Sequence, residues 1–195
     1  MKKDEIIKSS RELFTKHGFK RVSMDDIARE SGVTKKTIYT YFTSKEELLE
    51  FFIKEQLNNM KNIVEEIDKK NYDFYENIHQ IIYQLLKYRS QEDFLKLIAK
   101  EAKDYKSPIV IRKVSTIDSK IQEYILGKIK KAKENENINV NDEEIAAFLI
   151  YKMYISLIFE WDDSKQKLNE EIISKNIINF LKNGLGKKDV ENEKR

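Results

Sequence analysis

The amino-acid sequence predicts an all-α fold with two helical domains, and three observations support this prediction. The 195 residues include one Pro and five Gly, and 36% are charged, a composition that suits long helices with solvated outer faces. Apolar residues recur at helical spacing along most of the chain, without strand-like alternation. Hydroxyl residues precede several of these stretches, where they can cap a first turn. We expect about nine helices, with an N-terminal domain over residues 1–46 and a C-terminal bundle over residues 47–195.

Three short helices are expected in the N-terminal domain. Ser23 and Thr34 precede the second and third of them, and Ser23 has capping-box spacing with Asp26. Gly32 lies between these two helices, where it allows a tight turn with positive φ. A short helix, a Gly-containing turn and a second short helix predict a helix-turn-helix. The three helices are expected over about 3–17, 24–30 and 35–42.

The third helix has the composition of a surface that contacts DNA. Ile38 and Phe42, four residues apart, are the only residues of this helix whose apolar side chains we expect to be buried. The rest of the helix is basic and rich in hydroxyl groups, which suits a DNA major groove. Within the predicted contact set, Tyr41 and Lys45 are expected at phosphates and Ser23 at the DNA backbone. The expected DNA-binding residues are Ser23, Thr34, Lys35, Lys36, Thr37, Tyr39, Thr40, Tyr41 and Lys45.

The positive charge of the chain is concentrated at its N-terminal end. The net charge is only +3, but residues 1–45 hold eleven Lys or Arg against six Asp or Glu, a balance of +5. The remaining residues therefore carry −2. A basic excess on the segment with the helix-turn-helix is the electrostatic footprint that DNA binding requires.

Six longer helices are expected in the C-terminal domain. Ser44, with Glu47 at capping-box spacing, starts the first of them, which we interpret as the link between the two domains. Asn141 has similar spacing to Glu144, and Gly184 is expected to end the last helix. These helices are expected over about 44–67, 74–88, 92–104, 108–133, 141–161 and 168–183.

The last two helices predict a subunit interface. The helix over 141–161 is apolar on nearly all sides, and a helix of this kind is buried on more than one side. A central position in a monomeric bundle is the alternative. A two-fold dimer would supply the second helix-turn-helix that a DNA site with two half-sites needs. The expected interface residues are Ile155, Phe159, Ile173, Ile177, Phe180 and Leu181.

Aromatic residues of the C-terminal domain suggest a ligand cavity. Binding pockets combine apolar walls with a few polar groups, and tyrosine supplies both. Core packing is the alternative for each of these residues, and for His79 a place on the surface or at the core edge. The expected lining residues are His79, Tyr83, Phe94, Ile98, Tyr105, Tyr124, Tyr151 and Tyr154.

No catalytic, metal or cofactor site is expected. The chain has no Cys, its two His lie in different domains, and its five Gly form no phosphate-binding loop. Absence of Cys fits a reducing compartment, so we expect a cytoplasmic protein. The most apolar run, Ile145 to Phe159, is interrupted by Lys152 and is too short to span a bilayer. We expect no membrane association and no enzymatic activity.

The N-terminal quarter of the chain resembles the TetR family of bacterial transcriptional regulators. Its motifs follow one another in the order and spacing of that family: Leu13-Phe14, Gly18-Phe19, Ser23, Asp26-Ile27-Ala28, Gly32-Val33-Thr34-Lys35, Ile38-Tyr39-Thr40-Tyr41-Phe42 and Ser44-Lys45-Glu46-Glu47-Leu48-Leu49. The remainder matches only in length and helical character. The resemblance implies a homodimer built through the last two helices and an effector cavity inside the fifth to eighth helices.

The resemblance and the residues together predict a ligand-responsive regulator that binds operator DNA, usually as a repressor released by a small apolar or aromatic molecule. One alternative is a helical small-molecule-binding protein without a DNA-regulatory role. Reversing the charges of Lys35 and Lys36 would leave the behaviour of such a protein unchanged. The other alternative is a helical-bundle enzyme, which would need a clustered His, carboxylate or thiol site that the sequence does not show.

Overall fold

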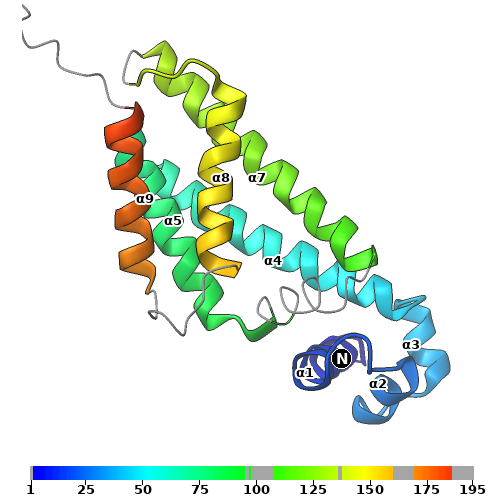
Figure 1. Cartoon of the computed structure of the whole chain (residues 1–195). Helices are drawn as coiled ribbons and strands as arrows, with labels where there is room; N and C mark the ends of the chain where they lie inside the picture. The colour runs from blue at the N-terminus through cyan, green and yellow to red at the C-terminus, as the bar shows by residue number, and fades with distance from the viewer. Residues whose placement is uncertain (1, 95–96, 98–107, 136–137, 160–168, 186–195) are drawn as a thin grey trace, which may run out of the picture. The chain divides into compact units, whose positions relative to one another are not determined.

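The described residues fold almost entirely into helices, and no strand occurs among them (Figure 1). The computed structural model describes residues 2–94, 97, 108–135, 138–159 and 169–185. The all-α prediction is confirmed. The helices are α1 (Lys2–His17), α2 (Met24–Glu30), α3 (Lys35–Tyr41), α4 (Lys45–Asp68), α5 (Phe74–Gln91), α7 (Pro108–Glu134), α8 (Glu143–Phe159) and α9 (Glu170–Leu185). The helix expected over 92–104 falls mostly outside the described residues.

The first three helices begin and end within a residue or so of the predicted positions, because local side chains set their ends. Ser23 and Asp26 form the complete capping box at the start of α2, and the Thr34 side chain accepts from the Thr37 N–H at the start of α3. At α4, Ser44 Oγ accepts from the Glu47 N–H as expected. The Glu47 carboxylate, however, accepts from the N–H and hydroxyl of Thr43 at 2.6 and 2.8 Å. A capping box would have the Ser44 N–H donate to the Glu47 carboxylate; here Thr43, one residue earlier, is the donor.

The last two helices start later than predicted, at residues with better capping geometry. Asp142 rather than Asn141 caps α8, because its Oδ1 accepts from the Ile145 N–H at 2.8 Å. Asn169 caps α9 in the same way, with its Oδ1 2.8 Å from the Ile172 nitrogen. A carboxylate or amide oxygen three residues before an unpaired N–H is the usual N-cap arrangement. Gly184 does not end α9, which continues to Leu185.

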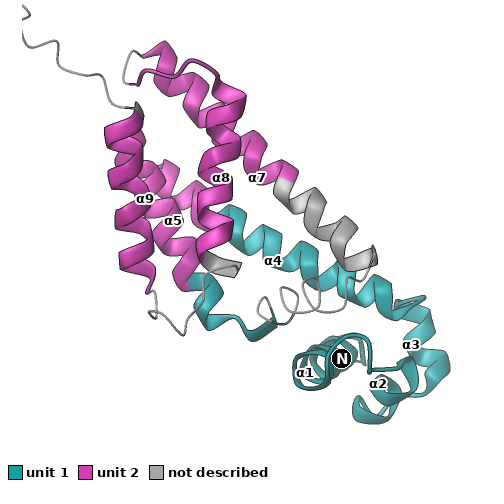
Figure 2. Cartoon of the chain, viewed as in Figure 1, with its two compact units in different colours: residues 1–62, 88–117 teal, residues 63–87, 118–195 magenta. Residues whose placement is uncertain are grey.

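The chain divides into two compact units (Figure 2). Unit 1 comprises residues 1–62 and 88–117, and unit 2 comprises residues 63–87 and 118–195. The domain boundary predicted after residue 46 lies inside unit 1. Unit 1 extends further because Leu48, Leu49, Phe52 and Ile53, on the first turns of α4, are buried in its core.

The core of unit 1 is built around interlocking aromatic rings. Phe14 and Phe52 are fully buried, with ring centroids 6.1 Å apart in an edge-to-face arrangement. Phe19 joins Phe14 at 5.4 Å, and Phe94 joins Phe52 at 5.3 Å. Such pairs add about 0.5–1.5 kcal/mol each beyond the burial of their area. This cluster therefore stabilises the packing of α1, α2 and α3.

The core of unit 2 combines residues from α5, α7, α8 and α9. Ile78, Ile129, Ile150 and Ile177, one from each helix, are all at most 3% exposed. Each fully buried side chain of this size contributes about 1.5–3 kcal/mol of hydrophobic stabilisation. None of the helices in the described ranges is both long and apolar enough to cross a membrane.

Candidate functional site

The turn between α2 and α3 has the geometry that the sequence predicts. The Val33 N–H donates to the Ala28 carbonyl at 3.1 Å, which folds the chain back after α2. Gly32 has φ +65°, and a Cβ atom built there would meet nothing within 4 Å. The glycine is therefore required by its backbone conformation alone, not by a close approach of a neighbour.

Two apolar anchors hold α3 on the unit 1 core, as predicted. Ile38 is fully buried and Phe42 is 4% exposed. The intervening residues point away from the core, with Tyr39 45% exposed and Tyr41 43% exposed. The remaining exposed residues on α3 and its N-cap are Thr34, Lys35, Lys36 and Thr40, while Thr37 is partly buried. The DNA contacts predicted among residues 35–41 therefore all lie on one seven-residue helix.

Hydroxyl groups on α3 already have local partners. The Thr40 hydroxyl donates to the Thr37 or Lys36 carbonyl, at 2.8 and 3.1 Å. The Thr34 and Thr37 hydroxyls lie 2.9 Å apart. The Thr40 proton is therefore used locally, whereas one hydroxyl of the Thr34–Thr37 pair keeps a proton that it can donate.

The two lysines of α3 differ in their surroundings. The Lys35 ammonium group forms an ion pair with Asp25 on α2, with Nζ 2.8 Å from Oδ1. That hydrogen bond and the charge of the carboxylate raise the pKa of Lys35. Lys36 is exposed, and its ammonium group has no ion-pair partner among the described residues. Lys36 is therefore the α3 lysine whose charge is available to a partner.

Ser23, expected at the DNA backbone, is part of the α2 cap. Its hydroxyl accepts from the Asp26 N–H at 3.2 Å and donates to the Asp26 carboxylate at 2.6 Å. The Asp26 carboxylate also accepts from the Ser23 N–H and pairs with Arg29. The hydrogen bonds from Ser23, and then that from Arg29, lower the pKa of Asp26.

Lys45, expected at a phosphate, has a different set of neighbours. Its Nζ donates to the carbonyl oxygens of Phe19, Lys20 and Val22, at 3.1, 3.3 and 3.1 Å. It also lies 4.6 Å from the centroid of the Phe19 ring. An ammonium group has three N–H donors, so the loop before α2 offers an acceptor for each of them. The sequence does not indicate these carbonyl partners of Lys45.

Phe94, expected to line the ligand cavity, lies instead in the core of unit 1. Its side chain is 2% exposed and packs against Phe52. The guanidinium of Arg11 lies 4.6 Å from the Phe52 ring and 5.4 Å from the Phe94 ring, and pairs with Glu55. Burial of an aromatic side chain in a packed core explains this position, so Phe94 is a structural residue of unit 1. Ile98 and Tyr105 lie outside the described residues.

Tyr124 belongs to a polar cluster in unit 2 that the sequence did not predict. Its hydroxyl donates to the Asp68 carboxylate at 3.0 Å, and Lys128 Nζ lies 2.6 Å from the same group. Asn77 Nδ2 donates to Asp68 as well, at 3.0 Å. Lys128 is largely covered in this cluster, with 23% of its side chain exposed. The signal in the sequence was only a polar break at Asp68.

The cluster shifts the pKa values of two groups in opposite directions. Burial alone would raise the pKa of Asp68, but hydrogen bonds from Lys128, Asn77 and Tyr124 hold it below its usual value. Burial, and then the neighbouring Asp68 charge, strongly raises the pKa of the Tyr124 phenol. The Tyr124 hydroxyl is thus committed to an internal hydrogen bond as a neutral donor.

The other predicted lining residues lie in unit 2 with different exposure. Tyr151 is 2% exposed and Tyr154 is partly buried, and both belong to or pack against the unit 2 core. His79 and Tyr83 are neighbours on α5, with ring centroids 6.5 Å apart. His79 Nδ1 is 3.6 Å from the Glu76 carboxylate. These placements fit core or core-edge positions as well as a cavity wall, so the ligand role remains a prediction.

Three of the predicted interface residues are core residues of their own subunit. Ile173, Ile177 and Leu181 are 7%, 2% and 3% exposed, because this face of α9 packs on the other helices of unit 2. Phe180 is 66% exposed and Ile155 is partly buried. The Phe159 side chain lies outside the described residues.

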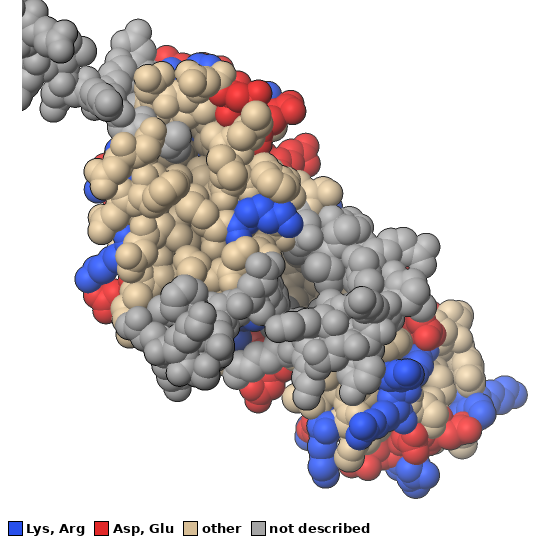
Figure 3. Space-filling model, in the orientation of Figure 1, with Lys and Arg blue, Asp and Glu red and all other residues tan. Residues whose placement is uncertain are grey.

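A second apolar face lies on α8 and α9, and Phe180 is the one residue of it that the sequence predicts at the interface. Ile145, Phe148, Leu149 and Phe180 are 59%, 47%, 53% and 66% exposed. The region over these two helices shows few charged side chains (Figure 3). Exposed apolar area of this kind usually marks an interaction site.

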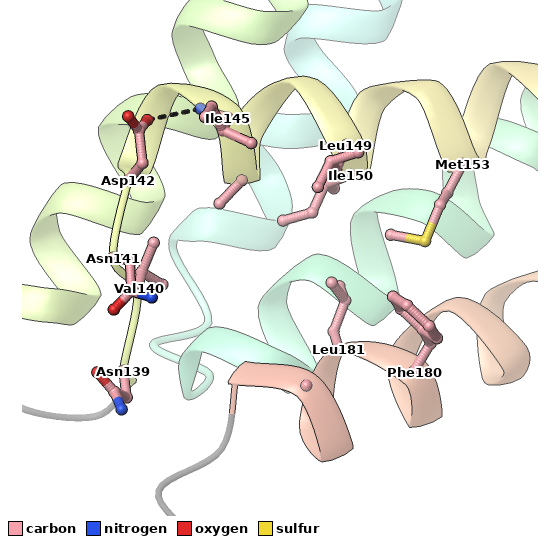
Figure 4. Close-up of a pocket in the computed structure, with 12 residues that line it drawn as sticks. Asn139, Val140, Asn141, Asp142, Ile145, Leu149, Ile150, Met153, Phe180 and Leu181 are labelled. Carbon is pink, nitrogen blue, oxygen red and sulfur yellow. Dashed lines mark hydrogen bonds between the residues drawn. The ribbon is translucent and has the colours of Figure 1, made fainter.

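A groove of about 460 Å³ runs between α8 and α9 on this face (Figure 4). Ile145, Leu149 and Met153 form its α8 wall, and Phe180 and Leu181 face them from α9. Asn139, Asn141 and Asp142, before α8, supply polar groups at one end. No cluster of three or more His, Cys, Asp or Glu that could hold a metal ion is found in the described part of the chain.

Sequence comparison points to one family of regulators. Residues 6–50 match the family model described as bacterial regulatory proteins, tetR family. The HTH-type transcriptional regulator YhgD of Bacillus subtilis (strain 168) is 30% identical over 184 residues, which cover 94% of this chain and 96% of YhgD. The resemblance therefore extends beyond the helix-turn-helix to unit 2.

Solved structures share the fold. The SmeT–triclosan complex superposes with a TM-score of 0.80 at 11% identity, covering 96% of this chain and 93% of SmeT. FadR from Bacillus subtilis in complex with stearoyl-CoA has a TM-score of 0.75 at 20% identity, with 91% and 96% coverage. At these identities the likeness concerns the fold alone. With the helix-turn-helix geometry and the full-length match to YhgD, the chain belongs to the TetR family of bacterial transcriptional regulators.

Proposed function

We propose that this protein is a homodimeric repressor that binds operator DNA through α3 and releases it when a small apolar or aromatic molecule binds unit 2. The observation that carries the proposal is the surface of α3. Lys36, Tyr39, Thr40 and Tyr41 project from a helix anchored by buried side chains and preceded by a tight turn. A basic, hydroxyl-rich face of this size fits the major groove. Such a protein acts in the cytoplasm and needs no catalytic residue.

The proposed DNA contacts are divided between base reading and positioning. Lys36, Tyr39 and Thr40 lie on the middle of α3, where base edges would be met. Lys35 and Tyr41 stand at its two ends, closer to where phosphates would lie. Thr34, Thr37 and Ser23 add hydroxyl groups at the helix starts. Phosphate contacts set the register on the duplex, whereas base contacts set the sequence preference.

Selection of bound fragments from random duplex DNA tests this proposal. The selected operator should bind with an affinity that falls steeply as salt rises. Lys36→Ala should then change the preference among operator variants, at roughly 1–3 kcal/mol for a lost base contact. Lys175→Ala, which removes an exposed lysine from α9, is the matched control and should bind like the wild type. Binding that does not respond to salt would exclude this mechanism.

A dimer follows from the need to contact two half-sites and is supported by the apolar face on α8 and α9. A two-fold interface brings the same patch of both subunits together. The groove beside Phe180 offers such a patch a place for an apolar side chain of the second copy. The proposal therefore assigns the interface to Ile145, Leu149 and Phe180 rather than to the buried face of α9.

The effector proposal is supported by the fold and by the ligands of its relatives. Triclosan, an apolar aromatic molecule, and stearoyl-CoA, whose acyl chain is apolar, are bound by SmeT and FadR, two proteins of this fold. In this chain, Tyr83, Tyr151 and Tyr154 are the aromatic candidates within unit 2. An effector lowers DNA affinity only by its differential affinity for the DNA-bound and free forms, typically about 1–3 kcal/mol.

Reciprocity provides the test of the effector proposal. Stearoyl-CoA and triclosan, used as two probes of different shape, should be titrated with and without operator DNA. A true effector must bind less tightly to the DNA-bound protein, by the same factor by which it weakens DNA binding. Equal affinities in the two titrations would show that the molecule binds without regulating.

A further inference from the structure

One side chain, that of Lys45, connects the two ends of the helix-turn-helix. The chain enters the motif at Val22, just before the α2 cap, and leaves it at Lys45, the first residue of α4. Lys45 Nζ donates to the Val22 carbonyl at 3.1 Å and to the Phe19 and Lys20 carbonyls at 3.1 and 3.3 Å. Residues 23–44, which contain α2, the turn and α3, are therefore bracketed by a single ammonium group.

These contacts use the hydrogen-bonding capacity that a phosphate would need. An ammonium group has three donors and no acceptor, and each donor has a carbonyl within reach. The Phe19 ring, 5% exposed, covers another side of the group at 4.6 Å from its centroid. A phosphate could bind Lys45 only by displacing a carbonyl oxygen, which would leave that carbonyl unpaired.

The contacts of Lys45 matter because α3 is too short to hold its own orientation. A seven-residue helix is far below the length at which an isolated helix is stable, so its position depends on its ends and anchors. Ile38, at the middle of α3, and Phe42, its C-cap residue, fix α3 against the core, whereas Val33, just before the N-cap, is only partly buried. On the opposite side, the turn connects α3 to α2, and α2 begins directly after the carbonyls that Lys45 holds. Lys45 thus fixes the α2 start relative to the α4 start.

We propose that Lys45 is a positioning residue that sets the orientation of α3 for DNA by clamping the loop 19–22, and that it contacts no phosphate itself. The inference rests on the proposed DNA-binding function. It differs from the expectation drawn from the sequence, in which Lys45 is one of the phosphate contacts.

The salt dependence of operator binding separates the two roles. Each phosphate contact contributes about 0.9 to the slope of log K against log salt, so a dimer that used both Lys45 side chains would lose about 1.8 in Lys45→Met. A clamp predicts no change in slope. It predicts instead a loss of affinity of about tenfold, measured well below the melting temperature, together with a melting temperature lowered by about 5 °C.

Two further measurements exclude a merely structural effect. Hydrogen exchange in Lys45→Met should rise at residues 19–26 but remain unchanged in α8 and α9. Lys54→Met removes one exposed lysine from the same helix without touching the loop and should keep wild-type affinity and exchange. If Lys45→Met is less stable yet binds operator with wild-type affinity when folded, the positioning role is wrong.

Lysine acetylation of the wild-type protein tests the clamp without any variant. Mass spectrometry after brief treatment with acetic anhydride should show Lys45 reacting slowly, at the same rate with and without operator. Lys36 should react quickly in the free protein and be protected by operator. A reactive Lys45 that operator protects, or a slope lowered by about 1.8 in Lys45→Met, would overturn the inference. A wild-type protein that binds no duplex, with Lys36 unprotected, would instead refute the proposed function and, with it, any role of Lys45 in DNA binding.

Discussion

Phe180→Glu should convert the proposed dimer to monomers without unfolding either subunit. Phe180 is 66% exposed on α9, whereas its neighbours Ile177 and Leu181 are 2% and 3% exposed. A charge at position 180 therefore points out of the subunit, and a charge at position 177 points into its core. The two substitutions, three residues apart on one helix, should have different consequences.

The size of the effect follows from the exposed area of the side chain. Fully burying a Phe side chain stabilises by about 1.5–3 kcal/mol, so the two-thirds of Phe180 exposed in the subunit represents roughly 1–2 kcal/mol. A two-fold interface contains this side chain twice, which gives roughly 2–4 kcal/mol per dimer. Since about 1.4 kcal/mol corresponds to a factor of ten, the dissociation constant of the dimer should rise by about 30-fold to 1000-fold. Desolvation of the new carboxylates adds to this effect.

Sedimentation velocity over a range of protein concentrations measures this change. Phe180→Glu should sediment as a monomer where the wild type is a dimer, keep its melting temperature within a few degrees, and bind a two-half-site operator poorly. Ile177→Glu should lower the melting temperature strongly because it buries a charge. Lys175→Glu puts the same carboxylate on α9 about 140° away around the helix and should remain dimeric.

The interface assignment has a clear refutation. If Phe180→Glu dimerises with the wild-type dissociation constant, the exposed face of α8 and α9 is not the subunit interface. A wild type that is monomeric at micromolar concentration would exclude the dimer itself. An equal loss of dimer in Lys175→Glu would show that any negative charge on α9 has this effect, and the specific role of Phe180 would be wrong.

Three further predictions concern stability. Gly32→Ala should cost about 1–2 kcal/mol, measured by chemical unfolding, because space for the methyl group is free and only the positive φ is strained. Asp68 has a lowered pKa in the folded chain, so its stabilisation is complete above its unfolded pKa of about 4 and is lost as pH falls through the folded value. Thermal unfolding of Asp68→Asn should therefore show a smaller loss of stability in acid than the wild type. Tyr124 has a raised pKa in the folded chain, so its stabilising contribution is present below its unfolded pKa of about 10 and declines at higher pH. Because the folded chain keeps this phenol protonated, Tyr124→Phe should leave the tyrosinate absorbance between about pH 9 and 11 unchanged.

Sequence predicted the elements around α2 and α3 well because local chemistry determines them. Ser23 and Asp26 need only each other and the first turn of α2 to form their capping box. Gly32 takes a positive φ that few other residues accept, so the turn is also local. None of these features depends on distant parts of the chain. The same reasoning was less accurate where a better cap lay one residue further along, as with Asp142.

The apolar helices were predicted less completely because their orientation is a tertiary property. A helix with apolar residues most of the way round shows that it is buried on several sides, but not which residues meet its own core. Ile177 and Phe180 look equivalent in the sequence, yet one is inside the subunit and the other is exposed. Phe94 illustrates the same point, since it follows α5 along the chain but packs beside Phe52 in unit 1. Only packing against other helices distinguishes such residues.

The three lysines of the DNA-binding unit show why charge patterns alone do not identify contacts. In the sequence, Lys35, Lys36 and Lys45 form one basic group around a recognition helix. In the structure, Lys35 pairs with Asp25, Lys45 meets three carbonyl oxygens, and Lys36 is exposed without an ion-pair partner among the described residues. A lysine that already has strong partners would have to give them up to bind DNA, whereas Lys36 would give up only water. The electrostatic footprint is therefore a property of the whole segment, but the energy of a specific contact depends on what each ammonium group leaves behind, and by that criterion Lys36 should contribute most.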